Sequence, residues 1–309
     1  MASNRIVVVG STNMDMVVKT THIPVPGETV LGGSFFMNPG GKGANQAVAV
    51  ARLGGDISFI SKVGNDIFGK QASQLFDEEG INTYHVLSDD NLPSGVALIT
   101  VDQAGENSIV VAAGANSNLY PADLEDALAE ISKSTIVLMQ LEIPLETVYY
   151  VAKYASSKGI KVILDPAPAN ELPAELLNHI DIITPNQTEA EMLSGIKVNN
   201  VKDAEKAAKV IAEKGVKKVV VTMGTLGAVI YETTQTRIIS AHKVNAVDST
   251  AAGDVFNGAL AVALSEGKTL ADAVEFACAA AAVSVTRMGA QSSIPYRNEL
   301  MATRLRQRE

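Results

Sequence analysis

Residues 246–260 place an acid directly after a run of small residues, at the start of a segment with helical character. Ala251, Ala252 and Gly253 lead into Asp254, and small side chains leave backbone N–H groups open to a ligand. A helix that begins there adds a partial positive charge at the same point. The pattern predicts an anion hole beside a carboxylate, which suits a general base that deprotonates an alcohol during phosphoryl transfer. Taken alone, Gly253-Asp254 is also typical of an ordinary turn and helix N-cap.

A glycine-rich turn at residues 40–45 opens a second segment that is predicted to be helical. Its Lys42 and Asn45 side chains can hydrogen-bond hydroxyl groups, although a bare glycine-rich turn is often only structural. It is not a Walker A loop, because Gly43 stands where Ser or Thr is required. Gln46 occupies the third glycine position of the dinucleotide fingerprint, which disfavours a nicotinamide-dependent enzyme.

Two further polar groups are candidates for ligand binding. Asn13 and Asp15 alternate with Thr12, Met14 and Met16, so on a strand they share one face and together could grip a vicinal diol. Glu142 comes three residues after the apolar run at 135–139. Taken alone, these residues are more typical of an ordinary polar strand face and of a surface acid at a strand end.

Polar residues also follow two later strands. Asn186 and Glu189 come after residues 180–184, where they could contact phosphates or water on Mg²⁺, or simply cap a helix. Another strand ends in a stretch whose amides and hydroxyls could reach phosphates or ribose, or which could be a plain turn. This stretch consists of Thr222, Met223, Gly224, Thr225, Leu226 and Gly227.

Composition limits the class of protein. The chain has 309 residues, of which 47% are hydrophobic, so it can bury a sizeable core. A net charge of −9 argues against nucleic-acid or anionic-membrane partners. The single cysteine, Cys278, excludes an internal disulfide and lies in an alanine run typical of a core. Without a signal-peptide pattern or an apolar run long enough to span a bilayer, we expect a soluble cytoplasmic protein.

Strand and helix patterns alternate through most of the chain, which indicates an α/β fold. The apolar strands favour a doubly wound, mostly parallel sheet with helices on both faces, and ligands at the carboxyl ends of the strands. Strands are expected at 6–9, 15–19, 57–61, 95–101, 108–112, 135–139, 160–164, 180–184, 218–222, 228–231 and 237–240. Helices are expected at 44–53, 68–79, 121–131, 145–157, 172–178, 189–193, 201–214, 252–265 and 270–285. The hairpin at 95–112 and the strand near 15–19 could form a small separate sheet.

Taken together, these clusters resemble the ribokinase-like carbohydrate kinases. The resemblance runs from GSTNMD at 10–15 to GAQSSIP at 289–295, and two motifs carry it: GGKGANQA at 40–47 and DSTAAGDVFNGAL at 248–260. It implies one α/β domain over residues 1–309, with a β-sheet lid formed by segments near 15–36 and 95–112. In this family two such lids clasp each other in a homodimer, so a homodimer is implied here.

The resemblance also implies roles for individual residues. The sugar would be held by Asn13, Asp15, Gly41, Lys42, Gly43, Ala44, Asn45, Glu142 and Asp254. The nucleotide would be held by Asn186, Glu189 and residues 222–227, with Gly253 at the transferred phosphate. A monovalent cation, K⁺ first, would lie near Asp248, Thr250, Ser284, Arg287, Gly289 and Ser293, partly through backbone carbonyls; oxygen ligands suit a hard cation.

Two positions depart from the family pattern. Cys278 stands where a histidine is common near the adenine, and Gln187 stands where an acid is common in the NxxE motif. Neither adjoins the expected base or anion hole, so they bear on nucleotide affinity more than on reaction type.

The implied reaction is ATP-dependent phosphorylation of a pentose, with D-ribose at its 5-hydroxyl as the first candidate and Mg²⁺ bridging the phosphates. Asp254 would be the base, and the amides of residues 251–253 would stabilise the developing charge. A kinase for 2-deoxyribose or another small sugar or nucleoside is the alternative. A non-catalytic sugar-binding protein on the same fold is a further one.

Overall fold

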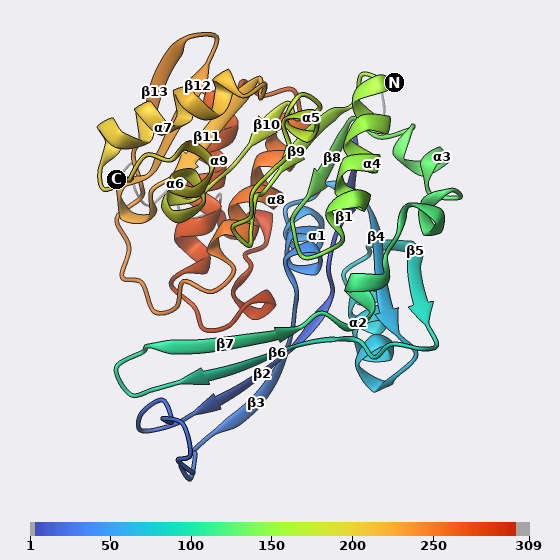
Figure 1. Cartoon of the computed structure of the whole chain (residues 1–309), viewed down its shortest axis with the longest axis vertical. Coiled ribbons are helices and arrows are strands. Elements are labelled where there is room, and N and C mark those ends of the chain that lie inside the picture. Colours follow the sequence, from blue (N-terminus) through green and yellow to red (C-terminus); the bar gives the residue numbers. More distant parts are fainter. Residues whose placement is uncertain (1–3, 301–309) are drawn as a thin grey trace.

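The computed structural model describes residues 4–300, and its largest feature is a nine-stranded sheet (Figure 1). The strand order is β13 (Gln235–Ile239), β12 (Ala228–Glu232), β11 (Lys218–Thr222), β10 (Ile182–Ile183), β9 (Lys161–Leu164), β8 (Ile136–Met139), β1 (Arg5–Val9), β4 (Asp56–Gly64) and β5 (Asn82–Asp89). All neighbours are parallel except β11–β12 and β12–β13. The strand order reverses at β1, so the carboxyl ends of β1 and β8 flank the point where ligands bind in such sheets.

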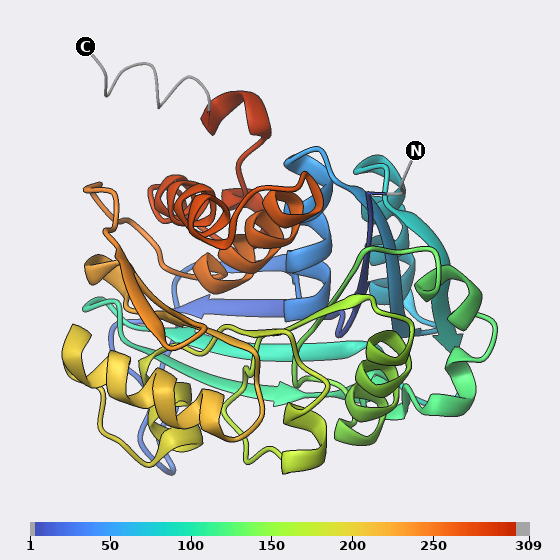
Figure 2. The same ribbon diagram turned by 90° about the horizontal axis from the view of Figure 1, so that it is seen from above.

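Helices cover both faces of this sheet (Figure 2). Alternate residues of β1 divide between the two faces: Ile6 and Val8 pack on one side, Val7 and Val9 on the other. The first face carries α1 (Lys42–Arg52), α2 (Ile67–Glu78), α8 (Ala252–Ser265) and α9 (Leu270–Ser284). The second carries α3 (Leu128–Ile131), α4 (Leu145–Ser157), α5 (Ala174–Leu177), α6 (Gln187–Ser194) and α7 (Val201–Glu213). The two-sided burial explains the continuous apolar runs of the parallel strands.

A separate four-stranded sheet projects from the main body (Figure 1). Its order is β3 (Phe35–Gly40), β2 (Asn13–Lys19), β6 (Gly95–Val101) and β7 (Asn107–Ala112). The β2–β6 pair is parallel, and the outer pairs are antiparallel. The predicted fold class, a mostly parallel doubly wound sheet with a small β lid, is confirmed.

The expected helix at 121–131 is wrong. The chain forms a short 3-10 helix at Pro121–Leu124, and α3 begins only at Leu128. The Asp123 carboxylate accepts a hydrogen bond from Tyr120 N at 2.8 Å and pairs with Lys62 Nζ at 3.0 Å. These side-chain contacts hold a turn where the local pattern favoured a continuous helix.

Strand β5 was not predicted from the sequence. Its residues Asn82–Asp89 lie at the edge of the main sheet and are mostly half-exposed, so they lack the apolar run that marks the central strands. The short helix expected at 172–178 is reduced to one turn, α5. The expected bounds of α8 agree with the structure, and those of α9 differ by one residue.

The close approach of α1 to the end of β1 depends on glycine. A Cβ on Gly43 would lie 2.5 Å from the Gly10 carbonyl carbon and 2.5 Å from Ser11 N. Neither backbone atom can move without shifting β1 or α1. This contact brings the start of α1, including Lys42, against the carboxyl end of β1.

We predict that Gly43→Ala lowers the free energy of unfolding by about 1–3 kcal/mol, the usual cost of overpacking. Chemical denaturation monitored by circular dichroism measures the change. Gly33→Ala is the matched control, because its added carbon would meet Lys19 O at an ordinary 3.7 Å. Equal stability of the two variants would contradict the packing argument.

Candidate active site

A cavity of about 210 Å³ lies at the carboxyl ends of the central strands. Consecutive strands contribute to it through the residues that follow them or end them: Asp165 after β9, Thr184 and Asn186 after β10, and Thr222 at the end of β11. The start of α8 closes it with Ala251, Ala252, Gly253 and Asp254, and Lys42 enters from α1. The fold therefore brings together the two motifs that lie about 200 residues apart in the sequence.

Asp254 lies in the first turn of α8 and is only 5% exposed. Asn45 Nδ2 donates to its Oδ2 at 2.9 Å, and Gln46 Nε2 donates to its Oδ1 at 3.1 Å. Burial raises the pKa of Asp254, while the charge of Lys42 and these two hydrogen bonds oppose the rise. A carboxylate held in this way has a fixed orientation and an increased affinity for a proton.

The small residues before Asp254 form a tight backbone turn. Ala251 adopts a left-handed conformation with φ 59°, which starts α8 without a side-chain cap. Ala252 N donates to Ser249 O at 3.2 Å. Gly253 N makes no hydrogen bond to another described residue, and a Cβ at Gly253 would meet nothing within 4 Å. Gly253 thus presents an open N–H at a helix N-terminus, the geometry that favours an anion.

Lys42 carries the positive charge of the cavity. Burial works against this charge, but the surrounding carboxylates outweigh it and raise the pKa of Lys42. In order of effect these are Asp254, Asp165, Glu142 and Glu189. The ammonium is therefore always charged at neutral pH and partly compensates the buried acids.

Glu142 anchors the loop that precedes α1. Its Oε2 accepts hydrogen bonds from Lys42 N at 3.0 Å and from Ser11 Oγ at 2.5 Å. Gly41, with φ 88°, forms the N-cap of α1, and the turn directs the backbone N–H of Lys42 toward Glu142. Glu142 is thus joined to the predicted sugar-site motif and is not an isolated surface acid.

Asp15 lies on β2, on the same strand face as Asn13. Burial, together with the charges of Glu142 and Asp254, raises the pKa of Asp15 to about 7, and Lys42 only partly opposes the rise. A Cβ on Gly40, in the neighbouring strand β3, would collide with the Asp15 carboxylate. The glycine leaves room for this side chain, which interacts electrostatically with Glu142, Asp254 and Lys42 although it does not line the cavity.

Sequence analysis missed three buried residues of the polar network that reaches Asp254 through Gln46. Gln46 Nε2 bridges Asp254 and Asp165, donating to Asp165 Oδ2 at 2.8 Å. Gln140 Nε2 donates to Gln46 Oε1 at 2.6 Å and so fixes the orientation of that amide. Asp165 directly follows β9, so the strand-end position that singled out Asn186 could also have found it. Nothing in the sequence alone marks Gln46 as more than a failed fingerprint position.

Asn186 and Glu189 form the cap of α6 and also line the cavity. Glu189 accepts from Asn186 N and from Asn186 Nδ2, both at 2.8 Å, and Asn186 Oδ1 accepts from Glu189 N at 2.9 Å. Burial raises the pKa of Glu189, against the effect of these hydrogen bonds. Both residues therefore cap α6, and the cap holds two oxygen-bearing side chains in the wall of the cavity.

A second cavity, of about 450 Å³, adjoins the first and shares Thr222, Ser249, Ala252 and Gly253 with it. Of the predicted nucleotide-binding stretch, Thr222, Gly224, Thr225 and Gly227 line this cavity. Met223 is instead buried in the core, and Leu226 is 48% exposed. Residues 241–244, which also line the cavity, carried no recognisable signal in the sequence.

Cys278 lines this second cavity together with Phe256, Ala281 and Ala282. It is half-buried, and desolvation raises the pKa of its thiol to about 11. The thiol is thus uncharged at neutral pH, and this part of the wall is apolar. That environment suits the flat face of a nucleobase better than it suits a phosphate group.

Asp248 connects two of the predicted cation residues, Thr250 and Gly289, while Ser284 ends α9 and Ser293 lies in the 3-10 helix Gln291–Ser293. The Oδ1 of Asp248 accepts from Thr250 Oγ1 at 2.6 Å and from Thr250 N at 2.9 Å, and its Oδ2 accepts from Gly289 N at 2.8 Å. Burial works to raise the pKa of Asp248, but these three hydrogen bonds outweigh it and lower the pKa. Arg287 pairs with Glu299, and the Ser284 hydroxyl donates within α9, so these two side chains point to other partners. Within residues 4–300 no group of three or more His, Cys, Asp or Glu side chains is arranged to hold a metal ion.

The cavities and the sheet define a class of protein: a doubly wound α/β enzyme with a buried acid–lysine pair at a helix N-terminus. Residues 3–297 match the family described as pfkB family carbohydrate kinase. The chain belongs to this family and is a ribokinase-like sugar kinase. In the described residues, no helix is long and apolar enough to cross a membrane.

Individual relatives agree with this assignment. A ribokinase of Haemophilus influenzae is 47% identical over 294 residues, which cover 95% of this chain and 96% of the relative. The structure of an Arabidopsis thaliana ribokinase complexed with ribose and ATP matches with a TM-score of 0.92 at 35% identity, covering 98% of each chain. A deoxyribokinase of Salmonella typhi is 39% identical over 291 residues, or 94% of this chain and 95% of the relative.

We predict that Asp15→Asn stabilises the ligand-free protein more at high pH than at low pH. The folded-state pKa of about 7 exceeds the ordinary 3.8, so the folded protein binds an extra proton between these values. The stability that the neutral carboxyl supplies is complete below about pH 4 and is lost as pH rises through 7.

Thermal unfolding at pH 5 and pH 8 measures this effect as the difference in midpoint between variant and wild type. The exposed Asp126→Asn, which changes the net charge equally, is the control. An Asp15→Asn difference that is the same at both pH values would show that Asp15 is not the titrating group.

Proposed function

We propose that this sugar kinase transfers the γ-phosphoryl group of ATP to the 5-hydroxyl of D-ribose. The observation that carries the proposal is the buried Asp254 carboxylate beside Lys42, at a helix N-terminus where Gly253 offers an open N–H. The ribokinase relatives support ribose as the acceptor, and the complex of the Arabidopsis protein supports ATP as the donor.

In the proposed reaction Asp254 accepts the proton of the sugar hydroxyl. The hydroxyl oxygen then forms a bond to the γ-phosphorus, and the bond between this phosphorus and the bridging oxygen of ADP breaks. The amide of Gly253 and the positive end of α8 stabilise the charge that builds on the transferring group. Asn45 and Gln46 hold the Asp254 carboxylate in place throughout.

The sugar and the nucleotide are assigned to opposite sides of Asp254. Asn13, Asp15, Glu142 and the start of α1 (Gly41, Lys42, Gly43, Ala44, Asn45) would hold the sugar. The second cavity would take the nucleoside, with Cys278 against the base and residues 222–227 at its mouth. The large volume and apolar wall of that cavity support this direction.

The oxygens of Asn186 and Glu189 fit Mg²⁺ held through water, because both side chains line the first cavity. Bound Mg²⁺ would neutralise charge on the phosphates. A monovalent cation, K⁺ first, would lie between the loops at Asp248 and Gly289. Because Arg287 and Ser284 direct their side chains elsewhere, only their backbone oxygens could contribute.

The deoxyribokinase relative keeps 2-deoxyribose as a second candidate substrate. A homodimer through the smaller sheet is part of the proposal, and exposed apolar side chains on β3, β6 and β7 support it. These are Phe35, Met37, Leu98, Ile109, Val110 and Val111.

The direct test is ADP release from Mg·ATP with D-ribose, 2-deoxyribose, fructose or adenosine, in K⁺ and then in Na⁺. We expect ADP with D-ribose above all others, and more of it in K⁺. Turnover only with another acceptor would replace the substrate while keeping the reaction. Ribose binding in calorimetry with no ADP from any acceptor would favour a non-catalytic sugar-binding protein.

We predict that Asp254→Asn lowers kcat by roughly 10²-fold or more, the usual contribution of a general base. The side chain keeps its size, so ribose binding measured by calorimetry should persist. Near-normal turnover by this variant would remove Asp254 from the role of base.

A further inference from the structure

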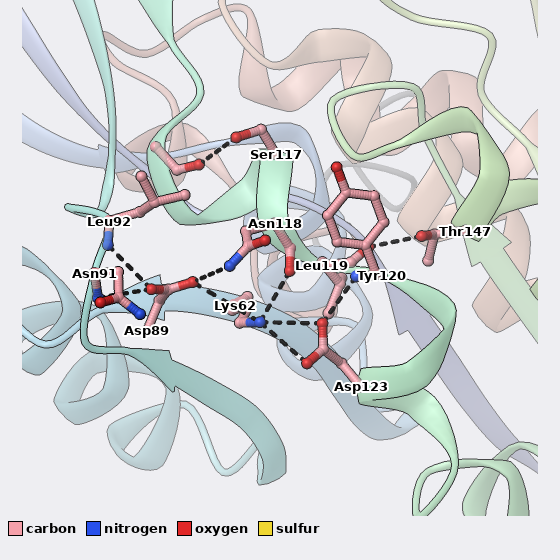
Figure 3. A network of polar contacts seen from close by, with 11 residues as sticks. Lys62, Asp89, Asn91, Leu92, Ser117, Asn118, Leu119, Tyr120, Asp123 and Thr147 are labelled. Carbon is pink, nitrogen blue, oxygen red and sulfur yellow. Dashed lines mark hydrogen bonds and ion pairs between the residues drawn. The ribbon is translucent and has the colours of Figure 1, made fainter.

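The smaller sheet is connected to the main sheet by a partly buried polar cluster (Figure 3). The chain leaving β7 forms a 3-10 helix at Gly114–Asn118. Asn118 Nδ2 donates to Asp89 Oδ2 at 2.5 Å, and the Asn118 carbonyl accepts from Lys62 Nζ at 2.9 Å. Since Lys62 and Asp89 belong to β4 and β5, this turn is fixed to the larger sheet.

Asn116, in the middle of the same turn, is 1% exposed and reaches the start of β2. Its Oδ1 accepts from Thr12 N at 2.8 Å, and its Nδ2 donates to Thr12 O at 3.0 Å. A backbone N–H can only donate and a carbonyl can only accept. These two bonds therefore determine which end of the Asn116 carboxamide is the oxygen.

The orientation of Asn116 determines that of Asn13. Asn116 Nδ2 also donates to Asn13 Oδ1 at 2.8 Å, so the Asn13 oxygen faces Asn116 and the Asn13 NH₂ group faces away. A Cβ on Gly95 would collide with both of the atoms that form this bond. The glycine in β6 thus leaves the space in which the two carboxamides meet.

The NH₂ group of Asn13, which faces away from Asn116, is available to a ligand. Asn13 Nδ2 makes no hydrogen bond to another described residue. Some polar atoms of residues 4–300 are fully buried and lack a partner, but Asn13 Nδ2 is not one of them. Asp15, two residues along β2, lies on the same strand face. One strand therefore offers a fixed donor next to a carboxylate acceptor, and a hydroxyl can accept from one while it donates to the other.

We propose that Asn116 is a positioning residue of the sugar site, which holds the Asn13 carboxamide with its NH₂ group toward the substrate. The proposal rests on the assignment of Asn13 to the sugar in the proposed function. Asn116 would thus belong to the sugar site without contacting the substrate. It would also link β2 to the turn at Gly114–Asn118, which Lys62 anchors.

Asn116→Asp tests this, because a carboxylate accepts but does not donate. Asn13 is then expected to turn its NH₂ group toward the introduced carboxylate and its oxygen toward the substrate. We expect KM for the sugar substrate to rise about 10-fold, which is the scale of one mispaired hydrogen bond. KM for ATP should stay unchanged. Asn118→Ala is the matched control: it loosens the same turn without touching Asn13 and should leave the sugar KM within about 2-fold.

The orientation of Asn13 is read separately, without any sugar, from the ¹H–¹⁵N resonances of its side-chain NH₂ group. We expect these to shift downfield in Asn116→Asp, because the group then donates to a carboxylate, and to stay unchanged in Asn118→Ala. If Asn116→Asp does not fold, Asn116→Ala should instead remove the fixed orientation, which shifts the same resonances, and also raise the sugar KM.

The outcomes separate this proposal from the proposed function. Unchanged Asn13 resonances in the folded Asn116 variant would overturn the positioning role, whatever sugar the enzyme uses. An equal rise of the sugar KM in Asn118→Ala would also overturn it, because general loosening of the turn would suffice. Shifted resonances in the variant of a protein that binds no sugar would keep the Asn116–Asn13 coupling but refute the proposed function, and with it the role in a sugar site.

Discussion

The interaction on which the site depends is the buried charge of Lys42 among four carboxylates. Asp254, Asp165 and Glu189 all have their pKa raised by burial, and Lys42 opposes that rise in each of them. Without the ammonium, several negative charges would share a cavity of about 210 Å³. A single lysine at the start of α1 therefore keeps Asp254 able both to exist as a carboxylate and to take up a proton.

The fold supplies this arrangement through strand order and close backbone packing. The reversal at β1 places the chain after β1 beside the chain after β8, where Ser11 and Glu142 meet. Gly43 lets α1 touch the end of β1, and Gly258 lets α8 approach α1, where a Cβ would lie 2.6 Å from Ala49 Cβ. The two motif-bearing helices thus reach one point from the same face of the sheet. The buried side-chain amides of Asn45 and Gln46 in α1 then donate hydrogen bonds to Asp254 in α8.

Sequence reasoning recovered what local pattern encodes. Apolar runs predicted the central strands, and small residues before Asp254 predicted the start of α8. It failed where tertiary contacts decide: Lys62 and Asp123 hold a turn inside the expected helix at 121–131, and the half-exposed edge strand β5 has no apolar run. Gln46 and Asn116 were missed for a related reason. Each of them matters because it contacts a carboxylate or carboxamide more than 100 residues away in the sequence. The residue type and its local helix or turn do not reveal that contact.

The proposed reaction requires Asp254 to contact the acceptor hydroxyl between the sugar and the γ-phosphate. A crystal structure of the protein with D-ribose and a non-hydrolysable ATP analogue would show this contact. We expect the ribose 5-hydroxyl oxygen within hydrogen-bond distance of the Asp254 carboxylate, with Gly253 N–H facing the γ-phosphate. A ribose bound with a different hydroxyl at Asp254, or with its 5-hydroxyl remote from this carboxylate, would rule out Asp254 as the base for the 5-hydroxyl.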